Sequence, residues 1–232
     1  MTMKYLSTLL IVLLLLTAGT AKDYKDKQFG LFRYELSISR DFEKEMKPLD
    51  DYIEGIETPT EVKKEKLKSV LIHHIYYHIE ERLEKEAEFS ILPVNSFLDE
   101  LKYNDFGYPT SSINEVIRLG YSQYFFRLDV AIETLTKDQE KLNPEMYDDL
   151  SGASTFPQLA ISMAVYDKNG IIPLERWTGN ATAVKPLPLE PELFAGFDRS
   201  ISYIRPKGEG NKESLYSLLD HAIDNLIKDI ND

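Results

Sequence analysis

Residues 123–135 hold the pattern that most restricts how this chain can fold. Apolar and other side chains alternate along this run with a period of two, which is the period of a β-strand. One face of the strand is apolar and consists of Tyr124, Phe126, Leu128, Val130 and Ile132. The other face is mixed and consists of Phe125, Arg127, Asp129, Ala131 and Glu133. Such a strand indicates an antiparallel or mixed sheet that carries its helices mainly on one face.

Other stretches predict further strands. Residues 29–38 alternate in the same way, with a predicted apolar side of Phe32, Tyr34, Leu36 and Ile38. A short strand is predicted over 89–94. The runs 158–166 and 171–183 predict a hairpin, because Asn169-Gly170 between two β-rich runs favours a turn in which both residues accept a positive φ.

Helical spacing of apolar residues predicts helices between and after these strands. A long helix is predicted to begin at the capping signal Thr58-Pro59-Thr60-Glu61 and to reach about Glu86. Shorter helices are predicted over 96–101 and over 111–119, and the second ends at Gly120. The last helix is predicted from about Lys212 to Ile230. Its apolar stripe consists of Leu215, Leu218, Leu219, Ala222, Ile223, Leu226, Ile227 and Ile230.

Together these elements predict an α+β fold. We expect a mixed, mostly antiparallel sheet of about five strands with helices packed mainly on one face. No linker and no internal repeat divides the chain, so residues 22–232 are predicted to form a single domain, of a length that can bury a sizeable core.

Residues 1–21 have the pattern of a secretory signal peptide. Lys4 precedes the apolar run 9–16, and small residues follow up to Ala21, after which the chain becomes strongly polar. The apolar run is shorter than the roughly 20 residues that a membrane-spanning helix needs, so we expect no stable membrane insertion. The chain has no Cys, which excludes disulfides and a lipid anchor on Cys. We therefore predict an exported protein that is periplasmic or extracellular.

The net charge restricts the partners of this chain. It has 27 Lys and Arg against 39 Asp and Glu, which gives a formal charge of −12. An acidic surface repels phosphate backbones, so we expect no nucleic-acid partner. The expected partner is a protein or another component of the cell envelope.

Catalytic motifs are missing from the sequence, and one cluster is suggestive. The chain contains no Gly-x-Ser-x-Gly, no phosphate-binding Gly-rich loop and no His-Glu-x-x-His. His74 and His78 are four residues apart on one predicted helix face, the spacing at which two imidazoles can share a metal ion. They also lie beside the apolar stripe of that helix, so the alternative is a pair of histidines that hydrogen-bond at the edge of the core. The sequence predicts no cofactor.

At the level of topology the chain resembles known periplasmic α/β domains. The segments that carry the resemblance are Phe89 to Asn95, Gly120-Tyr121-Ser122-Gln123-Tyr124 before the long strand, and Val165-Tyr166-Asp167-Lys168-Asn169-Gly170 in the hairpin. The order of elements is similar to that in penicillin-binding-protein activator lipoproteins, curli-secretion channel subunits and the amino-terminal domain of the Tol-system β-propeller protein. Many of these relatives are anchored through a Cys that this chain lacks. The resemblance implies an envelope assembly or interaction role, and it carries over no functional residue.

Two functions of different classes remain open from the sequence. The first is an exported binding or assembly protein that uses a sheet edge, the polar sheet face or the acidic loop 137–156 to meet its ligand. The second is a metal-assisted hydrolase centred on His74 and His78. The metal content of the purified protein would separate the two.

Overall fold

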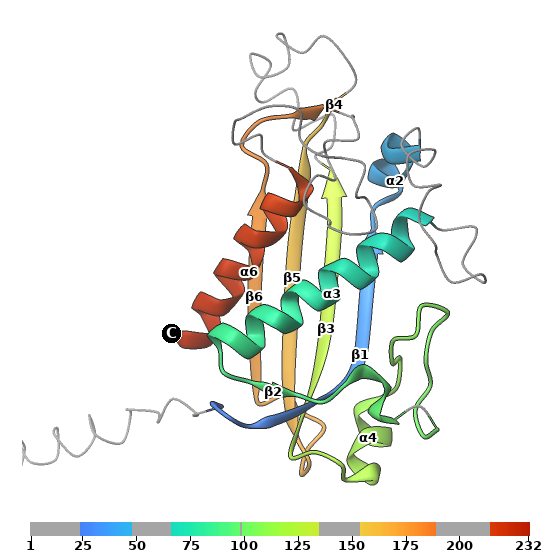
Figure 1. Ribbon diagram of the computed structural model, residues 1–232, viewed down its shortest axis with the longest axis vertical. Coiled ribbons are helices and arrows are strands. Elements are labelled where there is room, and N and C mark those ends of the chain that lie inside the picture. Colours follow the sequence, from blue (N-terminus) through green and yellow to red (C-terminus); the bar gives the residue numbers. More distant parts are fainter. Residues whose placement is uncertain (1–23, 48–65, 98, 135–153, 189–213) are drawn as a thin grey trace, which may run out of the picture.

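The computed structural model describes residues 24–47, 66–97, 99–134, 154–188 and 214–232 (Figure 1). The predicted signal peptide, the capping signal at Thr58 and most of the acidic loop 137–156 lie outside these residues. In chain order, the elements are β1 (Gln28–Ile38), α2 (Arg40–Met46), α3 (Lys66–Glu86), β2 (Ser90–Ile91), the 3-10 helix η2 (Val94–Phe97), α4 (Ile113–Leu119), β3 (Tyr124–Thr134), β4 (Ser154–Thr155), β5 (Pro157–Asp167), β6 (Glu175–Thr182), β7 (Leu187–Pro188) and α6 (Leu215–Asn231). None of the helices in the described ranges is long and apolar enough to cross a membrane.

Five strands form one mixed sheet in the order β2-β1-β3-β5-β6. Strand β1 pairs in parallel with β2 and β3, whereas β5 is antiparallel to both of its neighbours, β3 and β6. The long connection that contains α3 allows β1 and β3 to run in parallel. Helices α3 and α6 lie across the same face of the sheet (Figure 1). The predicted α+β fold, with a five-stranded mixed sheet and helices mainly on one face, is confirmed.

The main core lies between the sheet and the helices α3 and α6. The predicted apolar face of β3 is buried along its whole length, from Tyr124 at 8% exposure to Ile132 at 0%. The stripe of α6 is buried from Leu215 to Ile227, and Ile230 is half-buried at its end. The predicted apolar stripe of the last helix therefore packs on the apolar face of the sheet.

One strand departs from its predicted alternation. Strand β1 has a register irregularity between Leu31 and Arg33, so an extra residue enters on one side of the pairing with β3. Leu31 and Tyr34 belong to the main core, whereas Phe32 lies in a separate cluster with Phe125 on the opposite face. The prediction that Phe32 shares a face with Tyr34 is wrong, because a bulge shifts the alternation by one residue.

Helix α4 and the 3-10 helix η2 contribute to this second, smaller cluster. It consists of Phe32, Phe97, Leu101, Val116, Phe125, Ala164 and Tyr166. Helix α4 begins at a capping box between Ser112 and Glu115 and ends at Gly120, whose φ of 67° lies in the left-handed region. The predicted helix at 111–119 is thus confirmed, whereas the shorter one at 96–101 is observed as a 3-10 helix at Val94–Phe97.

The hairpin forms as predicted, but its turn differs. Strands β5 and β6 pair from Gln158 opposite Thr182 to Val165 opposite Glu175. Neither Asn169 nor Gly170 has a positive φ, and a longer segment joins the two strands. The Asp167 side chain accepts a hydrogen bond from the Asn169 amide at 2.9 Å, which stabilises this open turn. The prediction of a positive φ at both residues is therefore wrong.

Candidate functional site

The two histidines singled out by the sequence lie on α3, and His78 faces α6. Nε2 of His78 is 2.6 Å from Oδ1 of Asp220, and its ring stacks on that of Tyr216 with centroids 5.0 Å apart. His74 is half-buried one turn earlier. Across the described ranges, no group of three or more His, Cys, Asp or Glu side chains could hold a metal ion. A metal ion at Nε2 of His78 would replace the hydrogen bond between this atom and Asp220.

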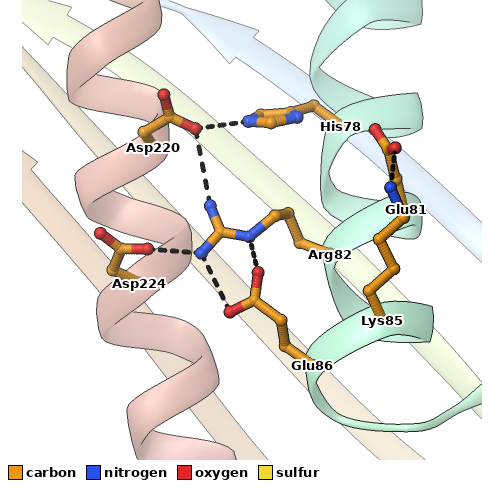
Figure 2. A network of polar contacts seen from close by, with 7 residues as sticks. All are labelled: His78, Glu81, Arg82, Lys85, Glu86, Asp220 and Asp224. Atoms are coloured by element: carbon orange, nitrogen blue, oxygen red, sulfur yellow. Dashed lines mark hydrogen bonds and ion pairs between the residues drawn. The ribbon is translucent and has the colours of Figure 1, made fainter.

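A network of polar contacts continues from His78 between α3 and α6 (Figure 2). Nη1 of Arg82 is 3.5 Å from the same Asp220 oxygen, and its Nη2 bonds to Asp224. Glu86 also accepts hydrogen bonds from Arg82, and these bonds raise the pKa of the guanidinium above its usual value. The network joins residues 142 positions apart in the chain, so the helical spacing of His74 and His78 gave no sign of it. We interpret it as a structural contact between the two helices.

The opposite face of the sheet carries polar side chains in ordered rows. The register of the strands aligns them across β1, β3, β5 and β6. The first row consists of Arg33, Arg127, Ala164 and Arg176, the second of Glu35, Asp129, Ser162 and Thr178, and the third of Ser37, Ala131, Ala160 and Asn180. Positive, negative and small side chains therefore follow one another along the strands.

A recess of about 410 Å³ lies in the second and third rows. Small side chains such as Ala131, Ala160 and Ser162 line it, because they leave space between the longer ones. We call this recess, which extends from Glu35 on β1 to Asn180 on β6, the sheet recess. Its carboxylates, hydroxyls and amide can donate and accept hydrogen bonds.

Ion pairs order the charged end of the sheet recess. Nη2 of Arg33 is 2.7 Å from Oε2 of Glu35, and Nε of Arg127 is 2.7 Å from Oδ2 of Asp129. The hydrogen bond from Arg33 lowers the pKa of Glu35, so this carboxylate is charged at neutral pH. Arg176 on β6 makes no ion pair with any residue that the structure describes.

Both long edges of the sheet are engaged within the chain. On β6, the Thr178 amide donates to Asp229 at 2.7 Å, and the Asn180 carbonyl accepts from the Asn225 side chain at 2.8 Å. On β1, the Ser111 amide donates to the Phe32 carbonyl at 3.1 Å. These contacts occupy backbone groups that a partner strand would need. Of the three surfaces considered from the sequence, the polar face is therefore the best candidate that the structure describes.

The sequence predicts part of this site. Alternation alone places Arg127, Asp129 and Ala131 on the polar side of β3. It does not reveal which residues of β1 and β6 stand beside them, because register depends on pairing between distant segments. Thr178 and Asn180 were missed, although they alternate with the buried Trp177 and Gly179.

Comparisons with known proteins place this chain in no family. No protein-family model and no curated protein matches it. A hypothetical protein from Chlamydia trachomatis has 8% identity and a TM-score of 0.39, over 89% of this chain and 99% of that one. A PelC dodecamer from Paraburkholderia phytofirmans has 13% identity and a TM-score of 0.33, over 92% and 95%.

A third solved structure is a neuraminyllactose-binding hemagglutinin homolog from Helicobacter pylori. It has 10% identity and a TM-score of 0.37, over 91% of this chain and 84% of that one. Likenesses this weak carry no argument about function. None of the three is named as one of the periplasmic groups that the topology resembles, so that resemblance stays an expectation.

Proposed function

We propose that this chain is an exported binding or assembly protein that contacts an envelope protein through the sheet recess. The observation that carries the proposal is the composition of this recess. Small side chains at its centre leave room for a partner group, and Glu35, Asp129 and Asn180 around them supply hydrogen-bonding groups. The helices α3 and α6 pack on the other face, so they leave this one accessible (Figure 1).

The charges around the sheet recess favour a protein as the partner. Two arginine–carboxylate pairs lie at one end, at Arg33–Glu35 and Arg127–Asp129, and side-chain hydroxyl and amide groups lie at the other. Protein surfaces offer both signs of charge together with neutral hydrogen-bonding groups. A polyanion such as nucleic acid would meet the acidic residues as well as the net charge of −12.

Capture of partners from native envelope extract tests the recess. Ser162→Arg fills the sheet recess with a long side chain, and Ser90→Arg places the same side chain on the exposed β2. We expect wild type and Ser90→Arg to retain the same protein, and Ser162→Arg to lose it while keeping its melting temperature. Equal capture by all three proteins would show that the partner binds to another surface.

The export part of the proposal has a separate test. Amino-terminal sequencing of the protein from the secreting cell should find a chain that begins near Lys22, because small residues precede this position and polar ones follow. A chain that still begins at Met1 would contradict export.

Metal analysis of the same material tests the alternative hydrolase, since stoichiometric zinc that depends on His74 and His78 would support it.

A further inference from the structure

A second recess, of about 540 Å³, lies beside α3. One wall is a single face of this helix, where His73, Tyr77, Glu80 and Glu84 follow one another at intervals of three or four residues. The segment after β2 forms the opposite wall with Val94, and Phe106 and Tyr108 also line the recess. We call it the α3 recess. It shares no lining residue with the sheet recess.

The α3 recess is lined by two glutamates, Glu80 and Glu84. Glu80 is half-buried and accepts a hydrogen bond from the Tyr76 hydroxyl at 2.9 Å. Burial raises the pKa of Glu80. The Tyr76 hydrogen bond lowers this pKa, and the negative charge of Glu84 raises it. Neither carboxylate makes an ion pair within the described part of the chain. Their negative charge is therefore not neutralised there.

Two cations of α3 are engaged by other carboxylates, and a third, Lys68, lies over the Phe106 ring. Arg82 bonds to Asp224 and Glu86, and Lys85 bonds to Glu81 (Figure 2). Among the described residues that line the α3 recess, His73 is the basic one, and its Nδ1 is 3.0 Å from the Tyr108 hydroxyl. Burial lowers the pKa of His73, so its imidazole is neutral at pH 7 and adds no positive charge.

Aromatic rings line another part of the recess. Tyr77 is 60% exposed, so its ring is accessible to a ligand. Phe106 already holds one ammonium, since Nζ of Lys68 lies 5.5 Å from its ring centre. Aromatic faces attract cations, and they also pack against alkyl chains. The recess therefore combines aromatic rings with two carboxylates that form no ion pair within the described ranges.

We propose that the α3 recess binds an aliphatic ammonium group. The ammonium lies against the carboxylates of Glu80 and Glu84, and its alkyl chain packs against Tyr77 and Phe106. A bound cation neutralises Glu80, a half-buried carboxylate that forms no ion pair with the residues that the structure describes. A lysine side chain of another protein and a free alkyl diamine share this chemistry. The site is independent of the function proposed for the sheet recess.

Calorimetric titration of the full chain at neutral pH and low salt tests the ligand class. The probes are cadaverine, Nα-acetyl-lysine amide and the uncharged diol with the same carbon chain as cadaverine. We expect saturable binding of an amine and none of the diol. Tighter binding of cadaverine identifies a free amine as the source, and tighter binding of the lysine derivative identifies a protein side chain. No saturable amine binding, or equal binding of the diol, overturns the proposal.

Substitutions locate the binding. Glu80→Gln keeps an acceptor for the Tyr76 hydroxyl and removes a charge that burial disfavours, so we expect it to fold at least as well as wild type. It should weaken amine binding at least about tenfold. Glu43→Gln is the control, because it removes the same charge from the exposed surface of α2. An equal loss of affinity in the two variants would show that the amine responds to the net charge of the protein. No loss in Glu80→Gln would show that the amine binds at another site. Glu84→Gln gives a second test of the same recess.

Discussion

The contact between α6 and the sheet depends on one residue without a side chain. A Cβ atom at Gly179 would lie 2.0 Å from the Ala222 carbonyl oxygen and 2.7 Å from the Leu226 amide nitrogen. Because both atoms belong to the helix backbone, the helix as a whole would have to move. The absence of a Cβ on β6 therefore sets the distance between strand and helix.

We expect Gly179→Ala to lower the free energy of unfolding by about 1–3 kcal/mol or more, as overpacking does in other cores. Gly170→Ala is the matched control, because the nearest atom to its Cβ would lie 3.9 Å away. Urea denaturation of both variants measures the difference. Similar stabilities would mean that α6 can shift away from β6 without cost.

His73 makes the stability of the fold depend on pH. Burial lowers the pKa of His73 in the folded chain below the usual 6.5. Between this lowered pKa and about pH 6.5, the unfolded chain therefore binds a proton that the folded chain does not. This contribution to stability is present above pH 6.5 and is lost as the pH falls through the lowered pKa. We expect His73→Gln to lose less stability than wild type between about pH 7 and about pH 5. If the stability of wild type and of His73→Gln changed with pH in parallel, the pH dependence would come from other groups.

At the level of secondary structure, Arg82 forms most of the polar contact between α3 and α6. It bonds to Asp224 on the other helix and to Glu86 on its own, and its side chain is only 19% exposed. The ion pair of Lys85 lies within α3, with 67% of the lysine side chain exposed. Pairs within one exposed helix surface contribute little to stability, whereas networks between elements contribute more.

We expect Arg82→Met to destabilise the fold by roughly 1–2 kcal/mol and Lys85→Met by roughly 0.5 kcal/mol or less. Methionine retains most of the alkyl volume, so the comparison isolates the charge. Thermal unfolding of the two variants at low and high salt provides the measurement. Equal effects would show that the network in Figure 2 does not stabilise the helix pair.

Helix α6 is expected to be required for folding. Its buried residues are Leu215, Leu218, Leu219, Ala222, Ile223, Leu226 and Ile227. Each large side chain contributes about 1.5–3 kcal/mol when buried, and an ordinary domain is stable by only about 5–15 kcal/mol. Truncation after Gly210 should therefore give an aggregated or protease-sensitive chain. A truncated chain that stays monomeric with an unchanged melting temperature would instead make α6 a detachable element.

The architecture of the molecule predicts unequal responses from the two faces of β3. Leu128 is fully buried between the sheet and its helices, so Leu128→Asp places a charge where burial costs several kcal/mol and should unfold the domain. Arg127 lies on the other face with 38% of its side chain exposed, and Arg127→Ser should change stability by roughly 1 kcal/mol or less. Melting temperatures measure both effects. Equal losses would show that both faces are equally covered.

The order and type of most elements could be predicted because each depends on local pattern. The alternation in β3 and the stripe of α6 reflect one buried side, and burial recurs with the period of the element. The two local errors arose where the backbone departs from a regular period. A bulge moves Phe32 to the other face, and a longer connection replaces the tight turn at Asn169-Gly170.

The sequence was sufficient for the α+β class and for the polar side of β3, since both follow from patterns within single segments. Only the tertiary structure decided which polar residues share a row, and that Asp220 on α6 stands opposite His78 on α3. It also assembled the α3 recess from segments on either side of β2. The physical reason is that register and helix docking depend on contacts between distant residues, which leave no periodic pattern in the chain.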